Sequence, residues 1–266
     1  MSCSGHLPVV AAAGLSLGYH GNPLLDDVVF DVKKGDVLAV VGHNGSGKST
    51  FVKTLLGVIP AVGGHLLWGR GRPEEIAYLG QLTEFDRCFP VRVRDLATMG
   101  AWHGLGFLGA ITGERRRRVD EALVRCGIEE IADQPIHELS SGQLQRALFA
   151  RTIVQDAPLI LLDEPFTAVD QTTEDKLLGL IDAWANEGRS VILVVHDLTA
   201  VLRHCNKALL LGNGLCRYGA PRDVLTPENL VEQGYMSAGQ ADWMSTMYRD
   251  DPTEKSAPRR KEALRV

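Results

Sequence analysis

Short apolar runs, bounded by glycine or polar residues, recur along most of the chain and define its expected strands. Each run is four or five residues long, which is the length of a buried strand and too short for a helix. Helix-length segments such as residues 50–56 and 172–185 lie between them. Strands that alternate with helices predict a mostly parallel sheet with crossover helices. The runs occupy residues 37–41, 76–79, 159–162 and 191–195.

Two other stretches follow different patterns. Residues 9–31 contain short alternating apolar runs with a turn at 20–23, which predicts a small antiparallel sheet at the start of the chain. From residue 82 to about 135 helix-length segments replace the strands. Helices are expected there over residues 91–99 and 114–126.

The first apolar run leads directly into a segment that matches the phosphate-loop pattern Gly-x-x-x-x-Gly-Lys-Ser/Thr. Its glycines let successive backbone N–H groups converge on a phosphate, and the following helix points its N-terminus at the same anion. We expect Lys48 to reach the β- and γ-phosphates of a nucleotide and the hydroxyl of Ser49 to hold Mg²⁺. The candidate phosphate-binding residues are Gly42, Asn44, Gly45, Ser46, Gly47, Lys48, Ser49 and Thr50.

The other three apolar runs end in side chains that can act on such a nucleotide. Ligands bind beyond the carboxyl ends of parallel strands, so all four strand ends are expected to meet at one site. Asp163 is expected to hold Mg²⁺ together with Ser49, and Glu164 to polarise the water that attacks the γ-phosphorus. Gln81 is expected to ligate the metal or orient that water, and His196 to bind the γ-phosphate. An ordinary polar loop start and a structural histidine are the alternatives.

A second helix start offers another anion site. Residues 139–143 read Leu-Ser-Ser-Gly-Gln, and Ser140 and Gln143 have the spacing of a capping box. Such a start presents free N–H groups and the positive end of the helix dipole. The chain therefore has two phosphate-type sites but one loop that contains Lys48. A symmetric dimer, in which each loop faces the other subunit's helix start, would account for this.

Composition narrows the classes of protein to be considered. The 266 residues are 45% hydrophobic and 23% charged, as in globular proteins, and the net charge of −5 disfavours a nucleic-acid partner. No stretch approaches the roughly 18 apolar residues of a membrane span, and no signal peptide is expected. The protein is therefore expected to remain in the cytoplasm. Five scattered cysteines predict reduced thiols rather than disulfides or a zinc site.

Three features leave alternatives open. Tyr19 can stack on a nucleotide base, although its spacing alone favours a half-buried strand tyrosine. The four consecutive arginines at 115–118 form either a solvated helix face or a contact for a partner's acidic loop or for lipid headgroups. The glycine- and aromatic-rich loop at 100–108 suits partner docking as well as ordinary packing.

Taken together, these motifs resemble the nucleotide-binding subunit of an ATP-binding cassette (ABC) transporter. The resemblance runs from about residue 15 to residue 225 and includes a further motif at 167–170. It implies that Tyr19 stacks on adenine, that Glu164 is the general base, and that Asp170 lies in a loop crossing a dimer interface.

The same resemblance gives the second helix start a role. It implies that Ser140 and Gly142 bind the γ-phosphate held by the partner subunit, within a motif that also contains Ser141 and Gln143. Ser141 departs from the family, because a glycine is usual at this position. His43 and Gly80 also depart, because both stand where proline is common. Neither the His43 nor the Gly80 departure removes a catalytic group.

The resemblance also implies a fold class and a domain organisation. The expected fold is α/β: a P-loop NTPase core with a mostly parallel sheet, an N-terminal antiparallel β subdomain and an inserted α-helical subdomain. The ATPase domain is expected over residues 7–234 and the helical subdomain over about 82–137. Residues 235–266 are expected to form a loosely structured tail.

Cargo and partners are implied in the same way. Residues 164–173 look like the branch that serves zinc and manganese importers. The resemblance implies a head-to-tail homodimer that uses ATP and Mg²⁺. It also implies that the helical subdomain docks on a membrane permease at the inner face of the membrane. A separate binding protein captures the metal. The nearest alternative cargo is an iron chelate, haem or cobalamin. Alternatives from other classes are a non-transport cassette ATPase and a nucleotide-binding regulator without turnover.

Overall fold

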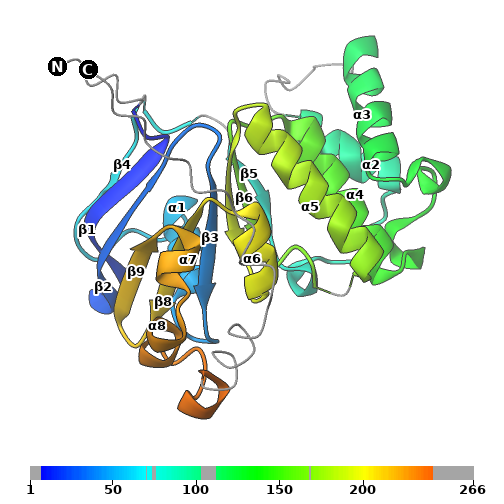
Figure 1. The fold of residues 1–266 in the computed structure, drawn as a ribbon. Helices are drawn as coiled ribbons and strands as arrows, with labels where there is room; N and C mark the ends of the chain where they lie inside the picture. The colour runs from blue at the N-terminus through cyan, green and yellow to red at the C-terminus, as the bar shows by residue number, and fades with distance from the viewer. Residues whose placement is uncertain (1–6, 70, 74–75, 103–111, 168, 242–266) are drawn as a thin grey trace, which may run out of the picture.

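A computed structural model of the chain shows two β-sheets that lie together on one side of the molecule, with a group of helices on the other side (Figure 1). The structure describes residues 7–69, 71–73, 76–102, 112–167 and 169–241.

The larger sheet forms the centre of the fold. Its strands are β3 (Val37–Gly42), β5 (Ile76–Leu79), β6 (Leu159–Asp163), β7 (Ser190–Val194), β8 (Lys207–Gly212) and β9 (Leu215–Gly219). They lie in the order β5-β6-β7-β3-β8-β9, and all neighbours are parallel except the antiparallel pair β8 and β9. Every residue of β3, β6 and β7 is buried, as expected of a sheet covered on both faces. The four predicted strands are confirmed, whereas the sequence pattern did not predict β8 and β9.

The predicted antiparallel sheet is also confirmed. It consists of β1 (Val10–Tyr19), β2 (Asn22–Val32) and β4 (Leu66–Leu67) in the order β2-β1-β4. Its apolar face shares a core with the large sheet and with α1 (Lys48–Leu55). In that core the rings of Phe30 and Phe51 meet edge to face, with centroids 5.2 Å apart. This packing fixes the helix that follows the phosphate loop.

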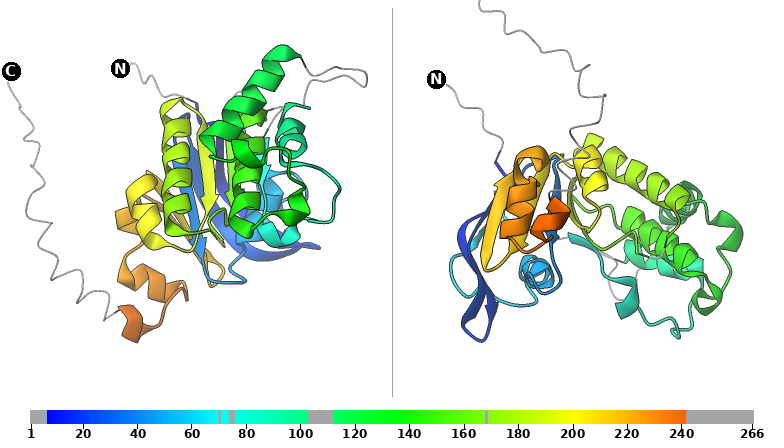
Figure 2. Two further views of the ribbon diagram at one scale, coloured as in Figure 1. Left: turned by 90° about the vertical axis from the view of Figure 1, so that its right-hand side faces the viewer. Right: turned by 60° about the horizontal axis from the view of Figure 1, so that its bottom comes forward.

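The helices α2 to α5 gather beside the sheets (Figures 1 and 2). One core cluster joins them to the large sheet, and within it the rings of Phe149 and Trp184 stack with centroids 6.1 Å apart. Every helix in the described part of the chain is too short or too polar to cross a bilayer. The α-helices that follow α1 are α2 (Val93–Thr98), α3 (Gly113–Arg125), α4 (Ser141–Gln155), α5 (Gln171–Asn186), α6 (Leu198–His204), α7 (Pro221–Val224) and α8 (Pro227–Glu232). The 3₁₀ turns are η1 (Leu82–Glu84), η2 (Met99–Ala101), η3 (Glu129–Ile131) and η4 (Ile136–Glu138).

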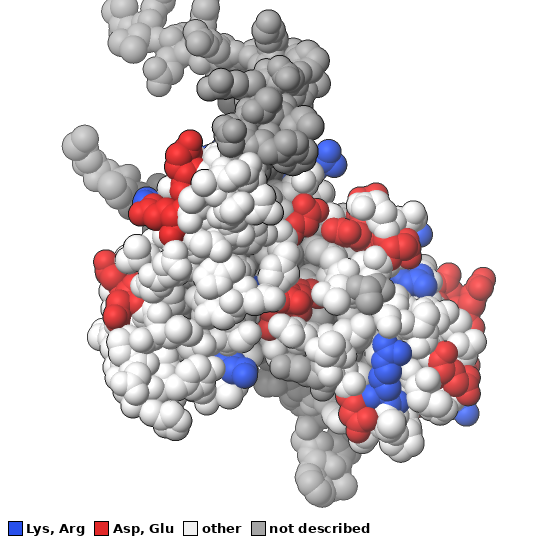
Figure 3. Space-filling model, turned by 90° about the horizontal axis from the view of Figure 1, so that it is seen from below, with Lys and Arg blue, Asp and Glu red and all other residues white. Residues whose placement is uncertain are grey.

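Ion pairs connect α3 to the loops that follow α4 and α5. Nη2 of Arg118 lies 2.8 Å from one carboxylate oxygen of Asp156, and Nη2 of Arg189 lies 2.5 Å from the other. Arg117 pairs with Glu121 one turn further along α3, at 3.5 Å. Part of the arginine run therefore belongs to a mixed-charge surface, and blue and red side chains lie next to each other on the helical side of the molecule (Figure 3).

The first residues of the expected loose tail are ordered. Tyr235 and Met236 pack against the main core, and Ala241 is 8% exposed. These apolar side chains give the segment burial that a fully polar tail would lack. Residues 242–266 and 103–108, the latter in the expected docking loop, lie outside the described part of the chain.

A cluster of charged and polar side chains joins three strands, β2, β8 and β9, to the residue that precedes β3. Nζ of Lys207 lies 2.7 Å from Oδ2 of Asp31 and 3.0 Å from Oδ2 of Asp36. The hydroxyl of Tyr218 donates to the backbone carbonyl of Asp31 at 2.6 Å and also lies 2.8 Å from Oδ1 of its carboxylate. Burial alone would raise the pKa of Asp31, but hydrogen bonds from Lys207 and Tyr218 hold it below its ordinary value. Burial alone would lower the pKa of Lys207, but its hydrogen bonds raise it.

We predict that Lys207→Met lowers the free energy of unfolding by about 2 kcal/mol, because it leaves the buried Asp36 carboxylate without its cation. The loss is smaller than for a fully buried pair, since Asp31 keeps part of its hydration. Folding raises the pKa of Lys207, so its contribution is complete below about pH 10, the ordinary lysine value, and is lost as pH rises through the folded value.

Urea unfolding followed by tryptophan fluorescence measures this change. Lys176→Met, at an exposed position of α5, is the matched control. The interpretation of the cluster is wrong if the two variants unfold within about 0.5 kcal/mol of each other, the ordinary range for surface substitutions.

Candidate active site

The carboxyl ends of four neighbouring strands meet at one hollow of about 440 Å³. The sequence prediction that these ends converge is therefore confirmed. The volume of the hollow is within the range of small-molecule sites, which runs from about 300 to 1,000 Å³. The hollow is lined by Leu24, Asn44, Gly45, Gly47, Lys48, Ser49, Thr50, Gln81, Glu164 and His196.

Two glycines of the phosphate loop lie where a side chain would not fit. Gly47 has φ +101°, and a Cβ there would lie 2.6 Å from Cδ1 of Leu25. A Cβ on Gly42 would lie 2.5 Å from the carbonyl oxygen of Leu211. The first helical hydrogen bond of α1 runs from Phe51 N to Gly47 O at 2.8 Å. The preceding N–H groups thus have no partner within the helix, which suits the binding of an anion.

The ammonium group of Lys48 places a positive charge inside the phosphate loop. Its side chain donates to the carbonyls of Gly42 at 2.7 Å and His43 at 3.0 Å, and the residue is only 7% exposed. Burial lowers the pKa of Lys48, although the charges of Glu164 and Asp163 act to raise it. The loop carbonyls therefore hold a positive charge beside the hollow, ready to meet an anionic group.

Glu164 and His196 are in direct contact across the strand ends. Nε2 of His196 lies 3.0 Å from Oε1 of Glu164. The backbone of Glu164 has φ +51°, a conformation that few residues other than glycine adopt, and its N–H donates to the carbonyl of Val194 at 3.0 Å. Strained backbone of this kind persists where the surroundings enforce it. The turn aims the carboxylate into the hollow beside the imidazole.

Three oxygen-bearing side chains come from three elements around the loop. Asp163 ends β6 and is 5% exposed, Gln81 follows β5 and lines the hollow, and Ser49 is exposed in the first turn of α1. Carboxylate, amide and hydroxyl oxygens are the ligands that Mg²⁺ takes in proteins. The residues present therefore fit a Mg²⁺ ion bound together with phosphate groups.

The second helix start has the predicted capping box. Oγ of Ser140 accepts from Gln143 N at 3.2 Å, and Oε1 of Gln143 accepts from Ser140 N at 2.9 Å. Ser141, where the family has glycine, is the first residue of α4 and keeps a negative φ. Its hydroxyl accepts a hydrogen bond from Nη2 of Arg87 at 2.9 Å. The sequence pattern did not predict this role of Arg87, because 54 residues separate it from Ser141.

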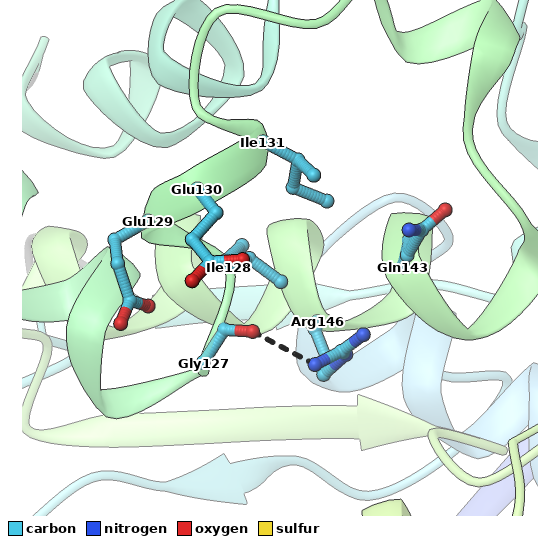
Figure 4. A pocket seen from close by; sticks show the side chains of 7 residues that line it. All are labelled: Gly127, Ile128, Glu129, Glu130, Ile131, Gln143 and Arg146. Carbon is cyan, nitrogen blue, oxygen red and sulfur yellow. Dashed lines mark hydrogen bonds between the residues drawn. The ribbon is translucent and has the colours of Figure 1, made fainter.

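The start of α4 does not share the hollow at the phosphate loop. Gln143 lines a different hollow, of about 320 Å³, together with Arg146 and residues 127–131 (Figure 4). There Arg146 donates to the carbonyl of Gly127 at 2.9 Å. Among the described residues, none from 140 to 143 lines the first hollow. The structure thus separates the two expected anion sites within one chain.

Two other candidates do not line the hollow: Tyr19 contacts a residue of its wall, and Asp170 directly precedes α5. Tyr19 is 45% exposed at the end of β1, and its hydroxyl accepts from Oγ1 of Thr50 at 3.4 Å. Asp170 caps α5 by accepting from both the N–H and the hydroxyl of Thr173, and these hydrogen bonds lower the pKa of Asp170. Base stacking by Tyr19 and the interface role of Asp170 stay predictions.

Comparison with known proteins gives matches in sequence and in fold. A model of the ABC transporter family matches residues 25–167. The manganese transport system ATP-binding protein MntB of Halalkalibacterium halodurans is 34% identical over 231 residues, which are 85% of this chain and 91% of that protein. The zinc transport system ATP-binding protein TroB of Treponema pallidum is 35% identical over 225 residues, which are 83% and 84%. A solved ABC transporter in an inward-facing conformation matches with a TM-score of 0.77 and 30% identity. The match covers 86% of this chain and 90% of the solved chain.

We predict that Lys48→Ala weakens ATP binding at least tenfold, because the phosphates lose a charge-assisted partner worth about 1.5 to 3 kcal/mol. Titration with a fluorescent ATP analogue measures the dissociation constant. Lys53→Ala is the control, since Lys53 lies in the last turn of the same helix and is exposed. If the dissociation constant of Lys48→Ala is within twofold of that of the control, Lys48 does not bind the phosphates.

Proposed function

The chain belongs to the ABC transporter family, and on that premise we propose that it is the ATPase subunit of an importer of a divalent metal. Two copies would bind and hydrolyse ATP between them and so drive transport through a membrane permease. The observation that supports this most is the single hollow at which the phosphate loop, Gln81, Glu164 and His196 meet. These parts come from the ends of four neighbouring strands and together suit phosphoryl transfer to water.

The residues in the hollow suggest a division of labour. Lys48 and the N–H groups at the start of α1 would hold the phosphates of ATP. Glu164 would accept a proton as water attacks the γ-phosphorus and the bond to the bridging oxygen breaks, which releases ADP and phosphate. His196, 3.0 Å from the Glu164 carboxylate, would orient that group and bind the γ-phosphate. Mg²⁺ bound by Ser49, Gln81 and Asp163 would supply charge neutralisation at the phosphates.

We also propose that the working unit is a head-to-tail homodimer. Ser140 is exposed and caps the N-terminus of α4. This helix start lines no part of the hollow at the phosphate loop. Two chains related by a twofold axis would present the α4 start of each to the ATP held by the other. Ser140 and Gly142 would then contact the γ-phosphate from the opposite side, with Asp170 near the interface.

The place of the subunit in the cell follows from its partners. We propose that the helical subdomain docks on an integral membrane permease, which would keep the ATPase at the inner face of the membrane. A separate substrate-binding protein would deliver the metal. Manganese and zinc are proposed as cargo because both relatives described above are named for these metals.

We predict that Glu164→Gln binds ATP, accumulates as a dimer and hydrolyses ATP at least 100-fold more slowly. The amide cannot accept the proton, and general bases typically contribute a factor of about 10² to 10⁴. Phosphate release measures turnover, and small-angle scattering with ATP measures the dimer. Glu228→Gln, at an exposed position of α8, is the control. Turnover equal to that of the control would exclude Glu164 as the base.

We predict that a strain lacking this gene loses uptake of radioactive manganese or zinc, and that the wild-type gene restores it whereas Glu164→Gln does not. Uptake of iron and of iron chelates is measured in the same strains. A loss confined to iron or its chelates would overturn the proposed cargo. Unchanged uptake of all of these would overturn the transport role.

A further inference from the structure

The hydroxyl of Tyr235 donates a hydrogen bond to the backbone carbonyl of His196, at 2.5 Å. Tyr235 lies 39 residues further along the chain, in the segment that was expected to be a loose tail. The bond therefore connects the C-terminal segment to the turn that carries a side chain of the ATP site.

The turn at His196 lies just past the end of the sheet. β7 ends at Val194, and Asp197 already serves as the cap of α6 by accepting from Thr199 N at 2.8 Å. The imidazole of His196 extends into the hollow and contacts Glu164 at 3.0 Å. The direction of this side chain depends on how its own peptide is held, and the Tyr235 hydroxyl is one of the groups that hold it.

Tyr235 is itself firmly placed. Its N–H donates to the carbonyl of Leu230 at 2.8 Å, and Leu230 is fully buried. Gln233 is 1% exposed, and its backbone packs so closely on Gly212 that a Cβ there would clash with it. The ring of Tyr235 packs against the main core. Burial, together with the charge of Asp197, raises the pKa of Tyr235, so the phenol remains a hydrogen-bond donor near neutral pH.

We propose that Tyr235 is a positioning residue for ATP hydrolysis, which holds the peptide of His196 so that its imidazole stays beside Glu164 and within reach of the γ-phosphate. This inference rests on the proposed ATPase function. It gives the segment that follows α8 a part in the chemistry, because the hydroxyl of Tyr235 holds the peptide of His196.

Tyr235→Phe tests the proposal, since it keeps the ring and removes the hydroxyl. We expect kcat to fall about three- to tenfold, the range for one lost hydrogen bond, with KM for ATP within twofold of wild type, because the phosphate loop is untouched. Tyr218→Phe is the matched control: its hydroxyl also donates to a backbone carbonyl, that of Asp31, outside the residues that line the hollow. Unchanged kcat in Tyr235→Phe, or an equal fall in both variants, would overturn the proposal.

A double-mutant cycle separates positioning from general stability. In a His196→Ala background, Tyr235→Phe is expected to cause no further loss in single-turnover phosphate release, because the side chain to be positioned is gone. An additional fall of the same size would mean that Tyr235 acts independently of His196. A wild-type protein without ATPase activity would instead contradict the proposed function itself, so the two failures are distinguishable.

NMR offers a readout that does not depend on turnover. The imidazole ¹H–¹⁵N signals of His196 are expected to shift in Tyr235→Phe and to stay in place in Tyr218→Phe. Signals of His196 that are identical in wild type and Tyr235→Phe would contradict the positioning role.

Discussion

A buried cation at the end of a parallel sheet is the constraint on which the site depends. The ammonium group of Lys48 is held by two loop carbonyls, at 2.7 and 3.0 Å, and by the nearby charges of Asp163 and Glu164. Such a charge is costly to bury unless polar groups surround it. At Gly42 and Gly47 the loop backbone lies so close to Leu211 and Leu25 that a Cβ would clash with them. The same geometry leaves the start of α1 free for the phosphates of ATP.

The two candidate anion sites of the chain lie at different places. The hollow at the phosphate loop holds Lys48, Glu164 and His196, and the capped start of α4 lies elsewhere, held by Arg87 and by its own capping box. A helix dipole and a set of unpaired N–H groups are useful to a triphosphate at short range. Association of two copies is the simplest way in which both sites can act on one ATP, and it would make hydrolysis depend on assembly.

The sequence predicted the parts of this arrangement that local pattern controls. Buried strands ending in polar residues were recognisable, and the parallel-sheet rule then placed Gln81, Glu164 and His196 together. β8 (Lys207–Gly212) was not predicted, because a short leucine-rich run fits a helix as well as a strand. Contacts between distant residues, such as that of Tyr235 with His196, leave no local signal. The strained backbone of Glu164 also has none, since the surrounding packing imposes it.

Cross-linking between two copies tests most directly whether the ATP site is shared. Asn44→Cys and Ser141→Cys are made separately in a chain whose natural cysteines are replaced, and the two proteins are mixed with ATP under mild oxidation. The account predicts disulfide-linked dimers in the mixture and none in either variant alone, because the phosphate loop of one copy faces the α4 start of the other. A mixture that forms no linked dimer with ATP, while both variants still bind the nucleotide, would contradict it.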